Sequence, residues 1–544
     1  MNTYLNKIVQ LLLLKMDTLC NLTQNLSLKD KDDKEKNFQL YPLKNHKYFP
    51  HQIQTGKWMK EQERDHPNGF KGGIISLTMG LGKTLLVLGY SLAHNKPTLI
   101  VVPKSILFEW KINVDKFFAQ DNNVKVLYFH RDINNQVDTL TLEDIVNHNI
   151  IITTYGVCSR ACLLGEYHKP RRERRSKLIY QDRGYALLYN LAWNRIIFDE
   201  SHKCCNPKTK TFHYLMTLKG RNNWCMSGTP IINYKTDIWS QLRLCGYTEV
   251  DTSKEWKAKG QKLFSTSLKS SVYSLQYADV GIRLPTLEQK KIIIELDDKQ
   301  QELYDLILFD VRKEYNRIIT LDKSYSCILV LLMRLRQAAI APYIISSEAK
   351  RQAVQSATYN LDKQLHGMQA AKIQKTISLV HTIKQQDQNT KIIIYSMFVT
   401  ALDLLYEAIR KYLPALQIVQ IDGETKNRNE ILDKFKNCNI DCMLTSYKVA
   451  AEGLTITQAN HCIFLEPWWN SATLNQARSR LWRVGQTRPV TVYNLISENT
   501  IEERLLEICD NKDIMVDSYL NANKGSEINC KLSKAVLHKL INKN

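Results

Sequence analysis

Apolar runs alternate with amphipathic stretches in two separate parts of the chain. In the first part, the runs GGIIS, TLIVVP, NIIITTY and RIIFDE occupy residues 72–76, 98–103, 149–155 and 195–200. Continuous apolar runs of this kind are typical of parallel strands that are buried on both faces. A second series begins near Ala371 and includes KIIIYS, LQIVQIDG, DCMLTSY, HCIFLEP and PVTVYNLI. The pattern predicts an α/β fold with two tandem parallel-sheet lobes.

The region between the two series has a different pattern. Residues 250–370 are polar and rich in Lys, Gln and Leu, and the stretch 299–319 repeats apolar residues at helical spacing. We therefore expect helical protrusions between the lobes. The predicted domains are an N-terminal appendage (1–44), a first lobe (45–249), the helical region (250–370), a second lobe (371–520) and a basic tail (521–544).

The charge balance is strongly basic. The 544 residues include 75 Lys+Arg and 54 Asp+Glu, which gives a formal net charge of +21. Such an excess favours a polyanionic partner through counterion release, although basic chains also bind anionic membrane surfaces. No run approaches the ~18 apolar residues that cross a bilayer, so no membrane segment is expected. We expect a protein that is not secreted and acts in the nucleus, or in a cytoplasmic factory or virion if it is viral.

The cysteines give no sign of a metal site. There are 13 of them, spread thinly and without a CxxC pair, whereas structural zinc sites bring short Cys/His pairs together. We expect reduced thiols in a reducing compartment and no structural zinc.

The segment MGLGKT, at Met79–Thr84, falls between a predicted strand and a predicted helix. Glycines let backbone N–H groups turn toward phosphate, and a helix N-terminus adds its positive end. Lys83 is then expected to reach the β- and γ-phosphates, with the Thr84 hydroxyl on Mg²⁺. The strict phosphate-loop pattern has glycine where this chain has Leu77. A glycine-rich turn with a chance GKT is the alternative.

Two adjacent carboxylates, Asp199 and Glu200, close the apolar run RIIFDE. Phosphoryl transfer depends on positioning and charge neutralisation more than on covalent help. Asp199 is expected to hold Mg²⁺ and Glu200 to polarise the attacking water. Acidic pairs are common on surfaces, but the preceding apolar strand and the upstream GKT make chance a poor explanation.

Two arginines, Arg480 and Arg483, lie three residues apart in QARSRLWRVGQ. This spacing predicts that both lie on one face of a helix in the second lobe. They are expected to reach across a cleft to the γ-phosphate as arginine fingers. A solvated basic helix face is the alternative, and it does not explain the flanking glutamines and glycine.

With these residues in place, the chain resembles the Swi/Snf-type ATPases, the chromatin-remodelling branch of helicase superfamily two. Matching segments run in the family's order from about residue 46 to 515. They are FPHQIQTGKWM (49–59), MGLGKT, VVPKSILFEW (101–110), ITTY (152–155), FDESH (198–202), SGTP (227–230), IIYS (393–396), DGETKNR (422–428), LTSYKVAAEGLTIT (444–457), PWWN (467–470) and the arginine segment.

The resemblance implies two RecA-like lobes that use ATP and Mg²⁺. It also implies roles for residues that the patterns above did not assign. Gln52 is expected to read the adenine, and the whole loop Met79, Gly80, Leu81, Gly82, Lys83 and Thr84 to hold the nucleotide. Coupling between the lobes is expected of Ser227, Thr229 and Gln476. The chain departs from the family at Leu77-Thr78, Ser201, 449–452 and Trp482, where histidine is usual. None of these departures removes a phosphate, metal or water-activating group.

Contacts to nucleic acid are expected mainly at phosphates, which track a backbone without reading its sequence. The candidates are Lys104, Ser105, Thr153, Thr154, Thr445, Ser446 and Lys448. Trp468 and Trp469 pack against either a sugar or base or the core, and core packing of at least one is preferred. The run KPRRERRSK (169–177) is either a solvated loop or a DNA-touching or nuclear-import segment.

Taken together, the sequence predicts a DNA-dependent ATPase that acts as a monomeric motor. We expect it to translocate on double-stranded DNA with little or no strand separation, remodelling protein–DNA complexes, forks or chromatin. One alternative is a strand-separating helicase on DNA or RNA. Another is a non-catalytic nucleic-acid-binding accessory to transcription, which the intact Lys83, Asp199 and Glu200 argue against.

Overall fold

The structure is a computed structural model of the chain. It describes residues 38–65, 69–93, 97–118, 121, 123–166, 187–231, 236–264, 268–320, 325–345, 362–425, 427–450, 456–468, 471–507, 538 and 540–541. The predicted appendage (residues 1–37 of it) and most of the predicted basic tail lie outside these residues, as does the run 169–177.

Seven parallel strands form the sheet of the first lobe, in the order β3-β4-β2-β5-β6-β1-β7. The central strands are buried on both faces, as their apolar runs predict. The strands are β1 (Gly72–Leu77), β2 (Thr98–Val102), β3 (Val126–Tyr128), β4 (Ile150–Thr154), β5 (Ala192–Asp199), β6 (Lys219–Met226) and β7 (Val272–Leu275).

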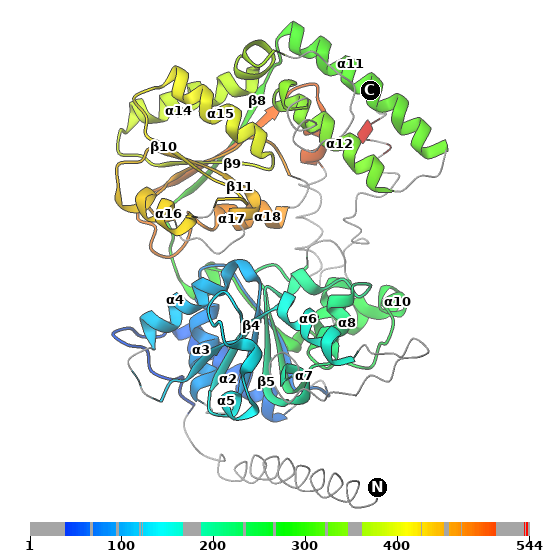
Figure 1. Cartoon of the computed structure of the whole chain (residues 1–544), viewed down its shortest axis with the longest axis vertical. Coiled ribbons are helices and arrows are strands. Elements are labelled where there is room, and N and C mark those ends of the chain that lie inside the picture. The colour runs from blue at the N-terminus through cyan, green and yellow to red at the C-terminus, as the bar shows by residue number, and fades with distance from the viewer. Residues whose placement is uncertain are drawn as a thin grey trace, which may run out of the picture.

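Helices cover both faces of this sheet (Figure 1). Successive strand residues point to opposite faces, so Ile74 belongs to one buried cluster and Ile75 to the other. The Ile75 face carries α2 (Pro50–Asp65), α3 (Lys83–Ala93) and α4 (Leu107–Phe117). The Ile74 face carries α5 (Leu142–Val146), α6 (Tyr155–Glu166), α7 (Leu187–Asn190), α8 (Lys210–Met216), α9 (Thr236–Leu244) and α10 (Ser253–Leu263).

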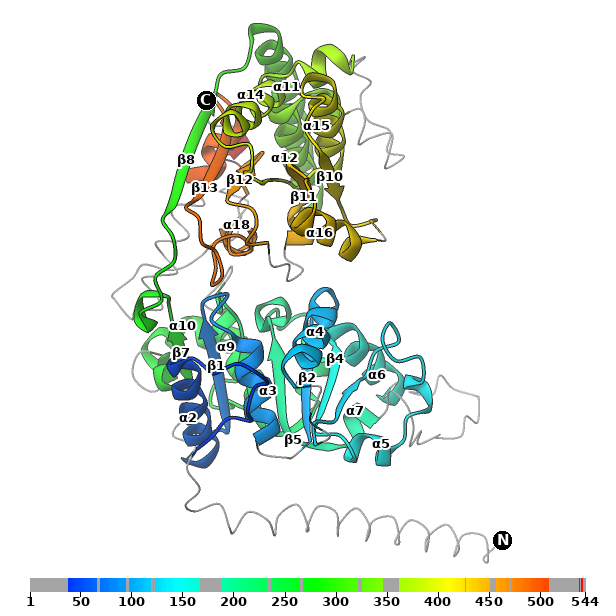
Figure 2. The same ribbon diagram turned by 90° about the vertical axis from the view of Figure 1, so that its left-hand side faces the viewer.

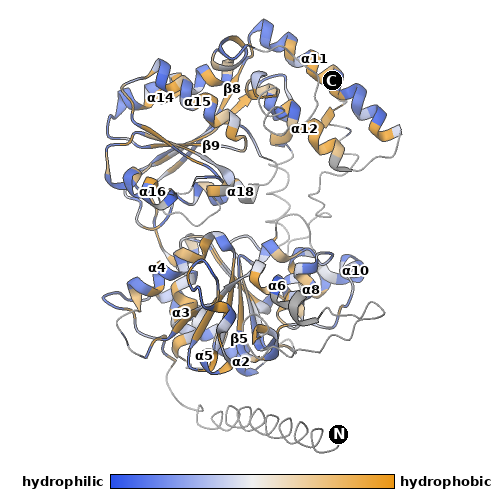
Figure 3. Ribbon diagram, viewed as in Figure 1, coloured by the Kyte–Doolittle hydropathy of each residue, from blue (hydrophilic) through white to orange (hydrophobic). Residues whose placement is uncertain are grey.

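The second lobe has a six-stranded parallel sheet in the order β10-β11-β9-β12-β13-β8. Its strands are β8 (Leu287–Ile294), β9 (Ile392–Ser396), β10 (Ile418–Ile421), β11 (Cys442–Ser446), β12 (His461–Phe464) and β13 (Val490–Ser497). One face packs on α14 (Ala371–Gln386) and α15 (Val399–Tyr412), and the other on α16 (Arg428–Asn437), α17 (Tyr447–Ala450) and α18 (Ser471–Arg478). In Figure 3 the strands of both lobes are largely apolar, whereas the helices are mixed.

Two long helices, α11 (Asp298–Thr320) and α12 (Tyr325–Ile340), project from the second lobe (Figures 1 and 2). They bury their own apolar cluster, which includes Tyr304, Ile307, Val311 and Leu335. The helical stretch predicted at 299–319 is therefore present, with its apolar stripe turned toward α12.

The predicted lobe boundaries at residues 249 and 370 need correction. The described residues of the interval 250–370 include strands as well as helices: β7 pairs with β1 of the first sheet, and β8 pairs with β13 of the second. The lobes therefore meet between residues 275 and 287. The reason is burial: β8 (LEQKKIII) is an edge strand with most of its residues exposed, so it lacks the apolar run of a buried strand.

Candidate active site

Three adjacent strands of the first sheet end at the candidate site. β1 lies beside β6, and β6 lies beside β5, all parallel. Their carboxyl ends therefore share one edge of the sheet, which is where α/β proteins bind ligands. The segments that follow these strands are the MGLGKT loop, SGTP and the pair Asp199–Glu200. The structure thus brings together three motifs that are spread between Met79 and Pro230 in the sequence.

The MGLGKT loop has the backbone that its glycines allow. Gly80 and Gly82 have φ values of +90° and +74°, in the left-handed region that favours glycine. Helix α3 begins at Lys83, which places Lys83 and Thr84 in its first turn. The Lys83 ammonium donates to the Leu77 carbonyl at 2.7 Å. Burial lowers the pKa of Lys83, while the charges of Glu200 and Asp199 oppose this shift.

Helix α2 holds the loop from the other side. The Gln52 amide accepts from the Phe49 N–H at 2.8 Å and donates to the Gly82 carbonyl at 3.1 Å. His51 lies 3.0 Å from the Leu81 carbonyl. Gln52 is almost fully buried, and a Cβ on Gly82 would lie 2.3 Å from its amide nitrogen. Gln52 is therefore placed against the phosphate loop.

Asp199 is the last residue of β5, and three side-chain and backbone donors fix it. The Trp110 indole donates to Asp199 Oδ2 at 2.9 Å, and the Glu200 N–H donates to Oδ1 at 2.9 Å. The Tyr155 hydroxyl donates to the Asp199 carbonyl at 2.7 Å. Burial raises the pKa of Asp199, and the charge of Glu200 adds to that effect. Such a buried carboxylate suits a cation partner.

Glu200 has a strained backbone, with a φ of +46°. Non-glycine residues rarely adopt this region, and such strain clusters at functional sites. Burial raises the pKa of its carboxyl, but His202 and Lys83 outweigh that effect, so the pKa lies below its usual value. The Glu200 carboxyl therefore lies among positively charged groups. His202 lies 3.3 Å from Glu200 Oε2 and 2.7 Å from the Ser227 hydroxyl.

The family departure at Ser201 has a structural explanation. Its buried hydroxyl lies 2.7 Å from Gln241 Oε1 of α9 and 3.2 Å from the Met226 carbonyl. The Gln241 amide donates to the Pro230 carbonyl at 2.6 Å. The Ser227 hydroxyl in turn accepts from the Thr229 N–H at 3.1 Å. Hydrogen bonds of Ser201 and His202, the two residues after the acidic pair, therefore connect this segment to SGTP.

Arg480 and Arg483 do not lie on a helix face, which corrects the prediction from their spacing. Helix α18 ends at Arg478, and residues 479–485 form consecutive turns. The buried Gln486 amide holds these turns by donating to the Ala459 and Leu481 carbonyls at 2.9 and 3.2 Å. Gly485 has a φ of +100°, which a side chain would strain. We call residues 479–485 the arginine turn.

The arginine turn faces the first lobe. The charges of Arg480 and Arg483 further lower the pKa of Lys83. Burial raises the pKa of Glu109 on α4, and the same two arginines oppose that shift. The Ser479 hydroxyl lies 3.0 Å from Met79 Sδ. Gln476, the last of the expected coupling residues, is buried, and its carbonyl accepts from the Ser479 hydroxyl at 2.8 Å.

The candidates for nucleic-acid contact divide into two groups. Lys104 is exposed and pairs with Asp132 at 3.0 Å, and Ser105 is partly exposed beside it. Thr153 and Thr154 are buried, with the Thr153 hydroxyl donating to the Phe129 carbonyl at 2.9 Å and Thr154 Oγ1 accepting from the Val157 N–H at 3.3 Å. Both hydroxyls are engaged within the fold, and contact of these residues with phosphate stays a prediction.

In the second lobe, Thr445 and Ser446 end β11 and are almost fully buried. The Lys448 side chain and Trp469 lie outside the described part of the chain. Trp468 is partly buried: it stacks on Tyr447, and the Arg336 guanidinium lies 4.7 Å from its ring centroid.

Several residues of the site were not singled out from the sequence. Trp110, Tyr155 and Gln241 support the acidic pair, and Gln486 supports the arginine turn. Trp110 and Gln486 lie inside segments that match family motifs, so the sequence offered a reason to expect a role for them. Tyr155 closes another such motif, whereas Gln241 had none, because its role depends on α9 packing against β6.

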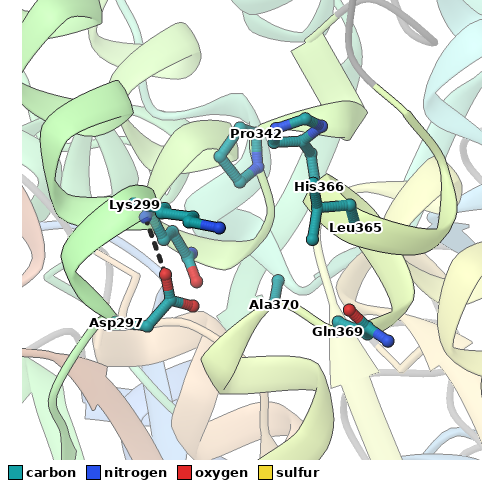
Figure 4. Close-up of a pocket in the computed structure, with 8 residues that line it drawn as sticks. Asp297, Lys299, Pro342, Leu365, His366, Gln369 and Ala370 are labelled. Atoms are coloured by element: carbon teal, nitrogen blue, oxygen red, sulfur yellow. Dashed lines mark hydrogen bonds between the residues drawn. The ribbon is translucent and has the colours of Figure 1, made fainter.

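A cavity of about 230 Å³ lies elsewhere, in the second lobe (Figure 4). None of the predicted site residues lines it; its lining residues are Asp297, Lys299, Gln300, Pro342, Leu365, His366, Gln369 and Ala370. Among the residues that the structure describes, no cluster of three His, Cys, Asp or Glu side chains could hold a metal ion. Within the same residues, every helix is too short or too polar to span a bilayer.

Comparison with known proteins identifies the class. The model of the SNF2-related domain matches residues 51–344, and that of the helicase conserved C-terminal domain matches residues 371–485. The chain therefore belongs to the SNF2-related family of helicases. It is a nucleic-acid-dependent ATPase, an ATP-dependent motor on nucleic acid.

The relatives include a viral protein of nearly equal length. Putative helicase 172L of Invertebrate iridescent virus 6 is 38% identical, over 94% of this chain and 96% of that protein. The putative ATP-dependent helicase/translocase YwqA of Bacillus subtilis is 25% identical over 84% of this chain, which spans 47% of that protein. A solved structure, the Sulfolobus solfataricus SWI2/SNF2 ATPase core in complex with dsDNA, is 23% identical with a TM-score of 0.39, covering 93% of this chain and 99% of that one.

Proposed function

We propose that this motor moves along double-stranded DNA and remodels protein–DNA complexes, with little or no separation of the strands. The observation that carries the proposal is the composite site. Lys83, Asp199 and Glu200 come from the first lobe, and the arginine turn that faces them comes from the second. Any movement of one lobe against the other therefore changes the site. A cycle of hydrolysis can in this way drive stepwise movement along a polymer.

Each residue has a chemical role under this proposal. Lys83 binds the β- and γ-phosphates, and the strained, charged Glu200 orients and polarises the attacking water. Arg480 and Arg483 stabilise the charge that develops on the transferred phosphoryl group. Thr84 and Asp199 fit Mg²⁺, because a hydroxyl and a buried carboxylate are the oxygen ligands that this hard cation prefers. When bound, Mg²⁺ neutralises phosphate charge.

Double-stranded DNA as the track is supported by family membership and by the net charge of +21. The phosphate contacts are expected at Lys104 and Ser105 in the first lobe and around Ser446 in the second. Contacts of this type position a protein on a backbone without reading bases. Little sequence preference is therefore expected.

The decisive experiment compares ATP hydrolysis with duplex DNA, single-stranded DNA, duplex RNA or no polymer. We expect strong stimulation by duplex DNA alone. In parallel, displacement of a third strand from a DNA triplex should occur, because it requires movement along the duplex, whereas a forked duplex should stay closed. Opening of the fork would favour a strand-separating helicase, and stimulation by RNA alone would contradict the proposed track.

Salt dependence gives a second test of how DNA is bound. For roughly 6–10 phosphate contacts, affinity falls on the order of 10³–10⁵-fold between about 50 and 200 mM salt. We expect a slope in this range from fluorescence anisotropy with a labelled duplex. A salt-insensitive complex that prefers one sequence would instead indicate base readout.

A further inference from the structure

Two aromatic side chains meet where the lobes come together. Tyr277 follows β7 and packs on the core of the first lobe, whereas Trp482 of the arginine turn packs on the core of the second. Their rings meet edge to face, with centroids 5.7 Å apart and an interplanar angle of 74°. Trp482 is one of the positions at which this chain departs from its family. The contact therefore joins the two lobes directly.

Both aromatic residues are anchored at their polar ends. The Tyr277 hydroxyl donates to the carbonyl of Met79, the first residue of the phosphate loop. The Trp482 indole donates to the Pro285 carbonyl at 2.8 Å, in the connection between β7 and β8. Both rings are thus held at one edge by hydrogen bonds to backbone. An aromatic pair that is partly buried and has both polar groups hydrogen-bonded has a defined geometry rather than a loose apolar contact.

The phosphate loop is shaped to accept this contact. A Cβ on Gly80 would lie 2.5 Å from the Tyr277 hydroxyl and 3.3 Å from Arg483 Cβ. Tyr277 and Arg483 therefore both pack closely against the backbone of Gly80, where there is no room for a side chain. Met79 also meets the second lobe at Ser479 and lies 3.0 Å from where a Cβ on Gly228 of the SGTP segment would be.

We propose that Tyr277 and Trp482 form an interlobe latch, a pair of positioning residues that holds the arginine turn against the phosphate loop. The proposal rests on the proposed role of Arg483 in hydrolysis. Trp482 directly precedes Arg483, so a fixed indole limits where the guanidinium can go. Tyr277 ties that position to Met79, and hence to the loop that carries Lys83. The latch thereby positions Arg483 of the second lobe next to the phosphate-binding loop of the first.

The test is steady-state ATP hydrolysis by the full chain at saturating duplex DNA. In Tyr277→Ala and Trp482→Ala we expect kcat to fall about tenfold, which equals about 1.4 kcal/mol of barrier. The KM for ATP and the affinity for duplex should stay within about twofold, because Lys83 and the DNA contacts are unchanged. The double variant should lose little more than either single one, since both remove the same contact.

Conservative variants separate positioning from a merely structural role. Tyr277→Phe keeps the ring and removes only the hydroxyl, so its loss of kcat should be smaller than that of Tyr277→Ala. Trp482→His keeps a ring with an N–H donor and should recover most of the rate lost in Trp482→Ala. Tyr412→Ala is the control: it removes a ring whose hydroxyl accepts from Gln364 at 2.8 Å, on the far end of α15. Thermal unfolding checks that each variant is folded.

The outcomes distinguish the latch from the function on which it rests. Wild-type kcat in folded Tyr277→Ala and Trp482→Ala, beside an inactive Arg483→Ala, overturns the latch alone. Full activity in Arg483→Ala overturns the proposed arginine role and the latch with it. A raised rate without DNA in Trp482→Ala also overturns the proposal, because the contact would then restrain the site.

Discussion

The two lobes have the same architecture but hold their functional groups in different ways. In the first lobe, three neighbouring buried strands position the functional groups: Asp199 ends β5, Ser227 directly follows β6, and Lys83 begins the helix after the loop that follows β1. In the second lobe, Arg480 and Arg483 lie in turns beyond the end of α18. Side-chain bonds from Gln486 and Trp482, rather than a strand, keep those turns in place.

This difference indicates a division of labour. A strand end inside a packed sheet is fixed by many backbone hydrogen bonds, so the first lobe presents a preformed binding site. The arginine turn reaches that site only in a particular arrangement of the lobes. The second lobe therefore determines when hydrolysis occurs, and the first determines what is bound. Variants in the two lobes should accordingly fail in different ways.

The largest effect is expected in the first lobe. Lys83→Ala should lose turnover together with ATP binding, because the phosphates lose their cation. Glu200→Gln should lose turnover but still bind ATP, since Asp199 and Lys83 remain. Hydrolysis and binding of a fluorescent ATP analogue are the measurements. Glu430→Gln, the same change on the exposed face of α16, is the control. Wild-type-like turnover in Glu200→Gln would remove its assignment as the water-polarising residue.

The next largest effect is expected in the arginine turn. Arg483→Ala and Arg480→Ala should lose most of the DNA-stimulated rate, on the order of 10³-fold or more, while duplex affinity survives. Arg488→Ala is a matched control, because Arg488 pairs with Asp387 at 3.2 Å and with Asn460 at 2.9 Å, outside the turn. Full stimulated rates in both turn variants would mean that the two-lobe mechanism does not apply.

A smaller effect is expected from the support beneath Asp199. Trp110→Phe keeps a buried ring but removes the 2.9 Å hydrogen bond to the carboxylate. Loss of such a partner typically costs 10–100-fold in metal affinity. The Mg²⁺ concentration for half-maximal hydrolysis should rise by about that factor. Trp193→Phe is the control, because its indole donates at 2.9 Å to the Leu188 carbonyl, away from the site. Equal Mg²⁺ dependence in the two variants would contradict this role.

The smallest effect is expected at Ser201, and on stability rather than rate. Ser201→Ala introduces the residue usual in the family but leaves Gln241 Oε1 without its 2.7 Å donor. An unsatisfied buried acceptor costs about 1–3 kcal/mol. The Tm should fall by several degrees while kcat stays within about twofold. Ser240→Ala is the matched control, because Ser240 lies on α9 beside Gln241. Its buried hydroxyl has no hydrogen-bond partner within the described part of the chain, so the Tm of this variant should equal that of the wild type. Equal Tm values would refute the explanation.

The sequence by itself determined the two parallel-sheet lobes and the edge at which the site forms. The apolar runs before Met79 and at 195–198 indicate strands buried on both faces, which is typical of the central strands of a parallel sheet. The sequence did not reveal which polar residues at strand ends are buried. Thr153 and Thr154 look like polar ends of a strand, yet every residue of β4 is buried, so their hydroxyls serve the fold.

Only the tertiary structure decided how the motifs meet. The polar strand β8 is recognisable as a strand only beside β13, and the bond from Trp110 to Asp199 spans 89 positions. The spacing of Arg480 and Arg483 suggested a helix face, but contacts with Ala459 and Ile456 hold that segment in turns. The meeting of Tyr277 with Trp482 depends on how two separately folded sheets pack. Local patterns report burial and periodicity within one element, whereas the partners of a side chain are set by the packing of distant ones.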